Sequence, residues 1–253
     1  MTRIFFDLGN TRIKWKLDSS APAQGAFTYE EMCPLLHQLR TESGGADSTA
    51  IVASVVKGSR YDAFVGALYA AGFNAVFRCV VTPFAAGVQC AYEDVSRLGI
   101  DRWLAVVAAW NQTQRPFVVV DLGTAATVDF VDEAGVHLGG YILPGLRLGV
   151  HALLKGTSDV RVDIDTLKDG HFFPGRNTEE AVCHGAVFAM KALIETALAR
   201  HLMRYPQSKL LITGGDCNLV APVLECHYQK DEDLVFAGMQ LLADARLVIK
   251  DSA

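Results

Sequence analysis

Two stretches of this chain repeat the same order of residues: an apolar run, an Asp-Leu-Gly turn and a second run of alternating polarity. The first copy has Asp-Leu-Gly-Asn-Thr at residues 7–11, followed by the run 13–17. The second has Asp-Leu-Gly-Thr at residues 121–124, between residues 117–120 and 126–130. Each copy predicts a β-hairpin with a carboxylate and a hydroxyl at its bend. The duplication predicts two halves of similar fold.

Length and composition agree with this expectation. The 253 residues could form one large domain or two domains of about 100–150 residues each. Hydrophobic residues make up 51% and charged residues 20% of the chain, which is typical of a globular, core-forming protein. A polar connector at residues 112–116 precedes the second hairpin. We therefore expect an N-terminal domain of residues 1–114 and a C-terminal domain of residues 115–253.

Charge and hydrophobicity exclude several classes of function. The net charge is −5 and no block of Lys or Arg occurs, so the sequence has no electrostatic footprint for nucleic acid. No run approaches the roughly 20 apolar residues of a membrane helix, and the N-terminus does not resemble a signal peptide. The six cysteines form no CxxC pair, which favours small buried thiols over metal ligands. We expect a cytoplasmic protein without a nucleic-acid or membrane partner.

Hydrophobic periodicity predicts the elements around the two hairpins. In the first half, strands are expected at residues 50–56 and 75–81, and helices at residues 30–40, 61–71 and 102–111. Residues 92–102 are irregular and polar, which indicates a functional loop. In the second half, strands are expected at residues 136–143 and 209–213, and helices at residues 146–155, 177–205, 218–225 and 237–248. Asn177 or Thr178 could cap the longest of these helices.

The Asp-x-Gly turn has chemistry suited to phosphate and metal ions. The glycine allows the backbone to approach a phosphate, and the following amides and hydroxyl can donate hydrogen bonds to its oxygens. The carboxylate can hold a cation, usually through water in the case of Mg²⁺. One such turn is weak evidence, because Asp-x-Gly is common in hairpins. Two copies in matching strand context favour a nucleotide phosphate site over a merely duplicated structural hairpin.

Further segments complete an ordered set. Gly99-Ile100-Asp101-Arg102, preceded by Tyr92, lies between the two hairpins. After them come Gly-Gly-Tyr-Ile-Leu-Pro-Gly at residues 139–145, then Asn177-Thr178, and then Thr213-Gly214-Gly215. With the two phosphate-type turns, this set resembles the type III pantothenate kinases, a family of the superfamily that contains actin-like ATPases, hexokinases and heat-shock chaperone ATPases. The resemblance covers nearly the whole chain, and the motifs are specific in combination.

The resemblance implies a duplicated ribonuclease-H-like α/β fold of two domains with a central cleft. It implies ATP-dependent phosphorylation of pantothenate to 4′-phosphopantothenate, the first step of coenzyme A biosynthesis, by a homodimer with Mg²⁺ and a monovalent cation, K⁺ or NH₄⁺. The ATP-binding residues it implies are Asp7, Leu8, Gly9, Asn10, Thr11, Arg12, Ile13, Lys14, Thr124, Gly214 and Gly215. The implied pantothenate-binding residues are Tyr92, Gly99, Ile100, Asp101, Arg102 and Thr178, with Thr178 acting across the dimer interface.

Three acids have distinct implied roles. Asp101 is the implied catalytic base, which accepts the proton of the pantothenate hydroxyl. Asp7 is the implied Mg²⁺ residue, acting through water, and Asp121 the implied ligand of the monovalent cation. Taken by itself, Asp101-Arg102 favours a surface ion pair or a helix N-terminal turn. Beside Tyr92 and the two hairpins, the catalytic interpretation is favoured.

Other residues keep two interpretations. Lys14 could face the phosphates or, with Lys16, the solvated face of a strand. Asp129 could order a metal site or simply end a strand. His137, His151 and His184 form no metal-binding array, which favours surface or core positions. The chain departs from the family pattern at Lys14-Trp15, where many members have a small residue, and at residues 157–161, which lack the family's proline.

Two rival functions are considered, of which the first belongs to another class. Some relatives of the family are described as transcription accessory factors, so a non-enzymatic regulator is one alternative. The presence of Asp7, Asp101 and Asp121 and the acidic charge argue against it. The other alternative is a kinase for a different small hydroxylated substrate, which the Gly-x-Asp-Arg segment disfavours through the resemblance alone.

Overall fold

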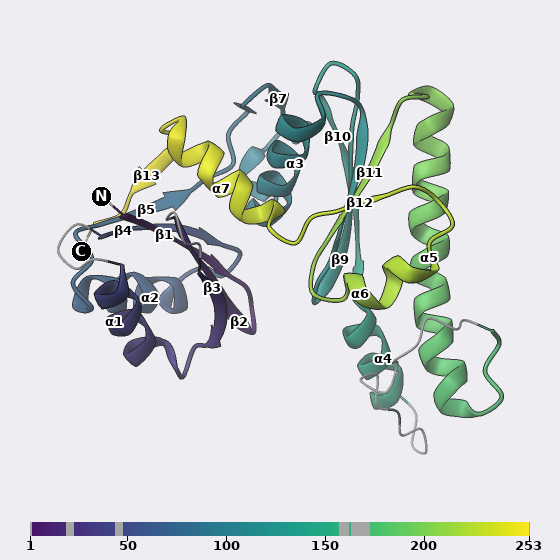
Figure 1. Ribbon diagram of the computed structural model, residues 1–253, viewed down its shortest axis with the longest axis horizontal. Coiled ribbons are helices and arrows are strands. Elements are labelled where there is room, and N and C mark those ends of the chain that lie inside the picture. Colours follow the sequence, from purple (N-terminus) through teal and green to yellow (C-terminus); the bar gives the residue numbers. More distant parts are fainter. Residues whose placement is uncertain (1, 19–22, 44–47, 157–161, 163–172, 253) are drawn as a thin grey trace. The chain divides into compact units, whose positions relative to one another are not determined.

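The chain folds into two compact units, each built around its own β-sheet (Figure 1). The structure is a computed structural model that describes residues 2–18, 23–43, 48–156, 162 and 173–252. Unit 1 contains residues 1–108 and 234–253, and unit 2 contains residues 109–233. Residues 157–161, where the sequence lacks the family's proline, lie outside the described residues.

The sheet of unit 1 begins with the first predicted hairpin. Strand β1 (Thr2–Leu8) pairs antiparallel with β2 (Arg12–Asp18), which pairs with β3 (Gln24–Thr28). On its other side β1 pairs parallel with β4 (Ser48–Ser54), and β4 with β5 (Ala75–Cys79). The last strand, β13 (Val248–Lys250), is antiparallel to β5. The sheet order is therefore β13-β5-β4-β1-β2-β3.

Unit 2 repeats this arrangement. Strand β8 (Phe117–Leu122) pairs antiparallel with β9 (Ala125–Val131), which pairs with β10 (His137–Pro144). On its other side β8 pairs parallel with β11 (Lys209–Thr213), followed by β12 (Gln229–Lys230). The order β10-β9-β8-β11-β12 corresponds strand by strand to β3-β2-β1-β4-β5. The predicted α/β fold with two similar halves is confirmed.

Helices cover both faces of the sheet in unit 1 (Figure 1). Helices α1 (Met32–Glu42) and α2 (Ser59–Ala70) bury their apolar residues against Ile4, Phe6 and Leu8 of β1. Helix α7 (Leu234–Asp244) packs against β1, β4 and β5. Helix α3 (Ile100–Thr113), preceded by the 3₁₀ turn η1 (Val95–Arg97), crosses α7 so closely that a Cβ on Gly238 would clash with the Leu104 backbone. A short hairpin, β6 (Phe84–Ala85) with β7 (Val88–Gln89), precedes η1.

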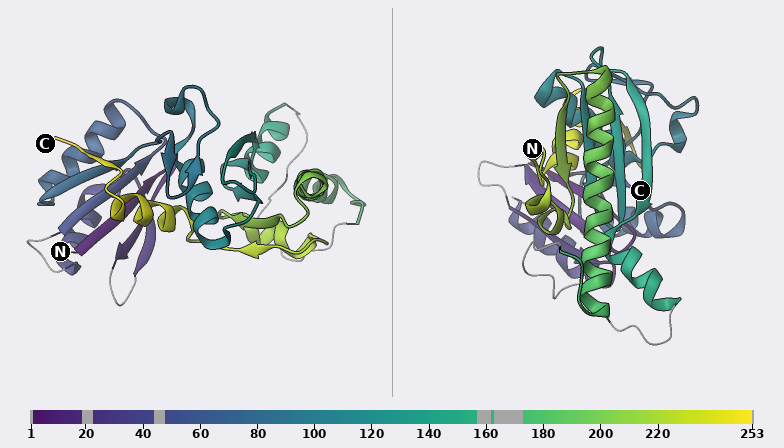
Figure 2. Two further views of the ribbon diagram at one scale, coloured as in Figure 1. Left: turned by 90° about the horizontal axis from the view of Figure 1, so that it is seen from above. Right: turned by 90° about the vertical axis from the view of Figure 1, so that its right-hand side faces the viewer.

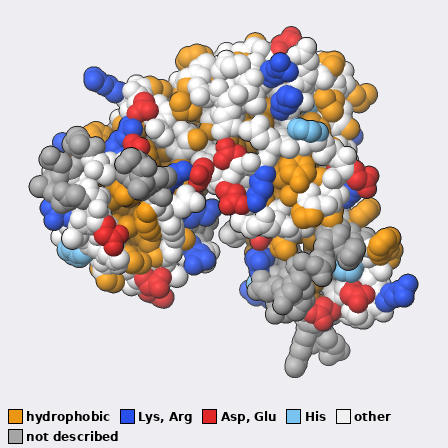
Figure 3. Space-filling model, in the orientation of Figure 1, with side chains coloured by type: hydrophobic (Ala, Val, Ile, Leu, Met, Phe, Trp, Pro, Cys, Tyr) orange, Lys and Arg blue, Asp and Glu red, His pale blue; other side chains and the backbone are white. Residues whose placement is uncertain are grey.

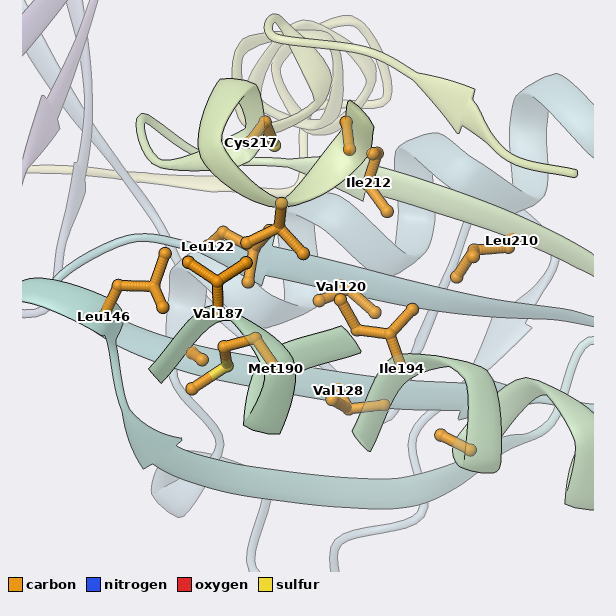
Figure 4. Close-up of a cluster of buried hydrophobic side chains, with 14 of the residues drawn as sticks. Val120, Leu122, Val128, Leu146, Val187, Met190, Ile194, Leu210, Ile212 and Cys217 are labelled. Carbon is orange, nitrogen blue, oxygen red and sulfur yellow. The ribbon is translucent and has the colours of Figure 1, made fainter. Parts of the chain in front are cut away.

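The core of unit 2 lies between its sheet and helix α5 (Thr178–Arg204), which runs along the strands (Figure 2). Val187, Met190 and Ile194 of α5 pack on Val120 and Val128 of the sheet (Figure 4). The remaining elements of this unit are α4 (Leu146–Lys155), α6 (Cys217–Val220) and the 3₁₀ turn η3 (Ala221–Val223). Asn177 caps α5, since its side chain accepts a hydrogen bond from the Glu180 amide at 2.9 Å. The predicted cap is thus confirmed, with Asn177 in that position.

The C-terminal end of the chain corrects two predictions. The helix predicted at residues 237–248 ends at Asp244, because the chain turns at Arg246, whose φ is +58°, and continues as β13. Since β13 pairs with β5, and Tyr69 donates a hydrogen bond to the Asp251 carbonyl at 2.7 Å, residues 234–253 belong to unit 1. The prediction that residues 115–253 form one domain is therefore wrong for these residues.

Helix α5 also changes an expectation from the sequence. By length and composition alone, this 27-residue helix is long and apolar enough to cross a membrane. It buries one face on the sheet of unit 2, and its Lys191 forms ion pairs with Glu195 and Glu225 at 3.2 and 2.8 Å. These contacts are typical of the core helix of a globular unit. On the face drawn in Figure 3, acidic and basic side chains are interspersed over both units.

Candidate active site

The first Asp-Leu-Gly turn joins β1 to β2 and places Asp7 directly opposite Lys14 in the strand register. The turn is closed by a hydrogen bond from the Gly9 amide to the Arg12 carbonyl at 3.1 Å. Asn10, Thr11 and Arg12 are exposed at the bend, and Lys14 is exposed beside Asp7. The turn therefore presents its amides, a hydroxyl and two cations at one end of the sheet. Lys14 lies next to the acid and not only on a solvated strand face.

Asp7 has an unusual protonation equilibrium. Burial raises its pKa to about 6, the charge of Asp101 adds to this increase, and the charge of Lys14 opposes it. The effect of Asp101 shows that the two acids share one electrostatic environment within unit 1. Asp7 of the first turn and Asp101 of the Gly-x-Asp-Arg segment, which are more than ninety positions apart in the chain, are thus brought together by the fold.

The raised pKa of Asp7 predicts a pH-dependent stability. Because the folded protein binds this proton more tightly than the unfolded chain, the free energy of unfolding should fall as pH rises from about 4 to about 6. Replacing Asp7 by Asn should flatten this decline by on the order of 2 kcal/mol. Urea unfolding at pH 4 and pH 7 measures the difference. Asp62→Asn, at an exposed acid of the same unit, is the control, and parallel pH profiles for wild type and Asp7→Asn would contradict the prediction.

The Gly99–Arg102 segment forms the start of α3. Asp101 lies in the first turn of that helix, and its carboxylate accepts a hydrogen bond from the Arg102 amide at 2.8 Å. Gly99 leaves room for this carboxylate, because a Cβ at Gly99 would clash with Asp101 Oδ1. The helix-start interpretation of Asp101 therefore holds, and it does not exclude a chemical role, since the same carboxylate influences Asp7.

Arg102 and Tyr92 form a second part of this region. The buried Arg102 donates a hydrogen bond through Nη1 to the Tyr92 hydroxyl at 3.0 Å, and its guanidinium lies 5.9 Å from the centre of the Tyr92 ring. The structure thus brings together the two residues predicted on either side of the substrate loop. A fixed guanidinium offers paired donors for a carboxylate or carbonyl oxygen.

The second turn occupies the equivalent place in unit 2. Asp121 lies near the end of β8, opposite Thr127 of β9 and Thr213 of β11. Thr124 is exposed at the bend, and its carbonyl accepts a hydrogen bond from the Gly145 amide at 3.0 Å. A Cβ on Gly145 would clash with the carbonyls of Gly123 and Thr124. Gly145, directly after β10, is therefore required for this close contact with the second turn.

The Thr-Gly-Gly segment after β11 lies against the same turn. Gly214 has a φ of +98°, and a Cβ there would clash with the Asp121 carboxylate and the Leu122 backbone. The next acid, Asp216, donates its amide hydrogen to the Leu122 carbonyl at 2.9 Å and accepts a hydrogen bond from Arg147 Nε at 3.0 Å. Neither Arg147 nor Asp216 belongs to a predicted site motif. Their positions next to the Pro-Gly and Gly-Gly motifs are the sequence signal that could have indicated them.

Asp129 has a partner that the sequence did not reveal. Its carboxylate lies 2.9 Å from His137 Nε2, and both residues are almost completely buried. This pair connects β9 to the irregular start of β10. Two buried charged or polar groups that satisfy one another are costly to break, so Asp129 has a structural use in unit 2. His184 Nδ1 contacts the Phe173 carbonyl at 2.8 Å, and His151 is exposed.

Thr178 is the first residue of α5. It lines a cavity of about 910 Å³ within unit 2, whose other walls include Gly145, Leu146, Gly185 and Met190. The walls are mainly apolar side chains of α4 and α5. The cavity thus connects the start of α4, which touches the second turn, with the start of α5.

The described part of the chain contains no group of three or more His, Cys, Asp or Glu side chains that could hold a metal ion alone. All six cysteines are free thiols, and burial raises the pKa of Cys79 and Cys217 to about 12. Any cation at the candidate site would therefore need oxygen atoms of its substrate or of water in addition to Asp7 or Asp121.

Comparison with known proteins identifies the family of this chain. The family model for type III pantothenate kinase matches residues 3–200. A type III pantothenate kinase of Chromohalobacter salexigens is 38% identical over 250 residues, covering 92% of this chain and 84% of its own. That of Marinobacter nauticus is 34% identical over 245 residues, covering 96% and 98%. The chain belongs to the type III pantothenate kinase family.

Solved structures agree with the fold. A protein from Campylobacter jejuni described as a Baf family transcriptional activator aligns with a TM-score of 0.61 at 23% identity, covering 96% of this chain and 98% of its own. MreB 5 of Spiroplasma citri, solved with AMPPNP, aligns with a TM-score of 0.52 at 10% identity, covering 97% and 96%. At these identities the likeness shows the fold alone, that of the actin-like ATPases. The predicted fold class is confirmed.

Proposed function

We propose that this protein is an ATP-dependent pantothenate kinase that forms 4′-phosphopantothenate, the first step of coenzyme A biosynthesis. The observation that carries the proposal is the family match over residues 3–200, which includes both phosphate-type turns and the Gly99–Arg102 segment. The shared electrostatic environment of Asp7 and Asp101 supports it, because a kinase needs an acid near the phosphates and a second acid near the attacking hydroxyl.

The proposed reaction moves the γ-phosphoryl group of ATP to the primary hydroxyl of pantothenate. Asp101 accepts the hydroxyl proton as the oxygen attacks phosphorus, and ADP leaves. Tyr92 and Arg102 bind the pantothenate chain, with the guanidinium directed at its carboxylate or amide oxygens. Gly99 and Ile100 complete this substrate loop, and Gly99 leaves the space that the Asp101 carboxylate occupies.

We assign nucleotide-binding roles to residues of each Asp-Leu-Gly turn. In unit 1 the backbone amides and side chains of residues 7–14 bind the phosphates, and in unit 2 the Thr124 hydroxyl contributes to nucleotide binding. Gly214 and Gly215 lie near the adenosine. Gly215 is exposed, and no atom lies within 4 Å of the position of a Cβ there, so this surface has room for a base.

Two kinds of cation fit the residues present. Asp7 fits Mg²⁺ through water, since burial and the nearby charge of Asp101 both raise its pKa, and a divalent cation close to it would oppose that increase by favouring the carboxylate. Asp121 fits a monovalent cation, K⁺ or NH₄⁺, because its carboxylate lies beside the polar backbone of Gly123 and Gly214. Mg²⁺ would shield the phosphate charge during transfer.

The assignment of Asp121 predicts a dependence on the monovalent cation. Activity should rise at least several-fold when NaCl is replaced by KCl or NH₄Cl at equal ionic strength. In Asp121→Asn this ratio should approach one, because the neutral amide attracts a cation much less strongly than a carboxylate does. Initial rates in the three salts, at saturating MgATP, provide the measurement. Equal rates for the wild type in all three salts would contradict the cation assignment.

We further propose that the protein acts in the cytoplasm as a homodimer, with Thr178 contributing to the pantothenate site across the interface. The apolar outer face of α5, with Phe188 60% exposed and Met203 86% exposed, supports an interface on this helix. Analytical ultracentrifugation of the purified protein tests the dimer, and a monomer at micromolar concentration would exclude it.

Coupled ADP release with a panel of small hydroxylated substrates, including pantothenate, tests the function. Pantothenate should stimulate ADP release far above background, whereas glycerol, hexoses and acetate should not. Stimulation only by another substrate would support the alternative of a different small-molecule kinase. Absence of any stimulation would support the non-enzymatic alternative, which the C. jejuni structure does not by itself favour because its likeness shows the fold alone.

A further inference from the structure

Two side chains that belong to none of the motifs bind backbone carbonyls of the first Asp-Leu-Gly turn. The Tyr29 hydroxyl, just after β3, donates a hydrogen bond to the Gly9 carbonyl at 2.7 Å. Arg60, in the first turn of α2, donates through Nη1 to the Asn10 carbonyl at 3.1 Å. The Arg60 guanidinium also lies 5.1 Å from the centre of the Tyr29 ring. Two consecutive carbonyls of the turn are therefore fixed by one interacting pair of side chains.

The two bonded carbonyls also determine the direction of the amides that follow them. In a planar trans peptide the C=O and the next N–H point in opposite directions. Fixing the Gly9 carbonyl therefore fixes the direction of the Asn10 amide, and fixing the Asn10 carbonyl fixes that of the Thr11 amide. The Gly9 amide is already bonded to the Arg12 carbonyl at 3.1 Å. The carbonyls of Gly9 and Asn10 thus point toward Tyr29 and Arg60. The N–H groups of Asn10 and Thr11 point to the other side of the turn, away from this pair.

The electrostatics of the pair agree with this geometry. Burial raises the pKa of Tyr29 above its ordinary value, and the nearby Asp7 charge adds to the increase while Arg60 opposes it, so the hydroxyl remains a donor at neutral pH. Arg60 brings a positive charge to the turn, whose bend residues Asn10, Thr11 and Arg12 remain exposed. An anion at the bend would meet two oriented amide donors and a cation behind them.

We propose that Tyr29 and Arg60 are positioning residues that direct the Asn10 and Thr11 amides at the phosphates of ATP. This inference rests on the proposed function, in which the first turn binds those phosphates. Neither residue needs to touch the nucleotide. Their effect should therefore fall on phosphate affinity and on turnover, and not on the affinity for pantothenate.

The test compares Tyr29→Phe and Arg60→Gln with two matched controls. Tyr69→Phe removes another Tyr hydroxyl that donates to a backbone carbonyl at 2.7 Å in unit 1, but at Asp251. Arg204→Gln removes another Arg that lies over a Tyr ring, at 5.5 Å from Tyr205 in unit 2. The measurements are KM for ATP, KM for pantothenate, kcat, and the midpoint of thermal unfolding, with direct titration of ATP binding by calorimetry.

We expect KM and Kd for ATP to rise about three- to tenfold in Tyr29→Phe and about tenfold or more in Arg60→Gln, because a charged donor contributes more. KM for pantothenate should stay unchanged. Arg60→Lys should recover part of the affinity, since an ammonium can also donate to the Asn10 carbonyl. Tyr69→Phe should lower the unfolding midpoint while leaving KM for ATP unchanged, and Arg204→Gln should leave KM for ATP unchanged.

The possible results separate the two proposals. If the wild type phosphorylates pantothenate and Tyr29→Phe and Arg60→Gln change only the unfolding midpoint, as Tyr69→Phe does, the positioning role is wrong. If the wild type binds ATP but releases no ADP with pantothenate, the proposed function is wrong. Calorimetry then still decides whether Tyr29 and Arg60 act on ATP.

Discussion

Replacing Asp101 by Asn should lower kcat for pantothenate phosphorylation by about 10²–10⁴-fold, the usual contribution of a general base. The fold and ATP affinity should remain close to wild type, because Asn keeps an oxygen that can accept the Arg102 amide hydrogen, as the carboxylate does at 2.8 Å. The amide cannot accept the hydroxyl proton. Steady-state kinetics, with calorimetric titration of ATP, measure both parts of the prediction.

The control for Asp101 is another acid that begins a helix in the same segment. Asp94 accepts a hydrogen bond from the Ser96 amide at 3.1 Å at the start of η1, so Asp94→Asn tests the loss of charge at a helix start alone. It should change kcat less than about twofold. A near-normal kcat in Asp101→Asn would remove Asp101 as the base, and its position at the start of α3 would then be its whole role.

Replacing Gly214 by Ala should destabilise unit 2 by about 3 kcal/mol or more, with loss of most activity. Its φ of +98° is strained for any residue with a side chain, and the added Cβ would clash with the Asp121 carboxylate and the Leu122 backbone. Both must move to relieve the clash, and both belong to the second turn. The free energy of unfolding from urea titration and the initial rate in saturating substrates are the measurements.

Gly215 provides a control one residue away. No atom lies within 4 Å of the position of a Cβ there, so Gly215→Ala should leave the free energy of unfolding within about 0.5 kcal/mol of wild type. If the adenosine lies at this surface, KM for ATP should nevertheless rise. Equal losses of unfolding free energy in Gly214→Ala and Gly215→Ala would show that backbone strain and the clash at Gly214 do not cause the destabilisation.

The elements that periodicity predicts well are those whose own residues carry a regular apolar pattern between turn residues. Both hairpins, the helix at residues 146–155 and the strand at residues 209–213 are present as predicted. Periodicity does not predict the end of α7, because Leu247 and Val248 continue an apolar pattern of helical spacing. The turn at Arg246 and the pairing of β13 with β5, whose residues lie about 170 positions away, override that local preference.

The residues of the candidate site also fall into two groups, those that a sequence motif indicates and those that only the folded structure shows. Asp7, Asp101 and Asp121 could be named from their motifs, since each lies near the end of a strand or begins a helix in a recognisable pattern. Tyr29 and Arg60 belong to no motif, and their importance depends on how β3 and α2 fold back on the first turn. The contact between Arg147 and Asp216, which lie 69 positions apart, depends on tertiary folding in the same way. The Asp129–His137 pair joins consecutive strands, but alternating polarity does not show which polar side chains of those strands meet.

The sequence alone determined the duplication, the two phosphate-type turns and the family, because alternating hydrophobicity and short motifs are local and repeat in order. The tertiary structure alone decided three further features: the return of residues 234–253 to unit 1, the common environment of Asp7 and Asp101, and the two side chains that hold the first turn. Each depends on residues far apart in the chain. Only packing of the complete sheet and its helices places them at contact distance, and no local pattern records that packing.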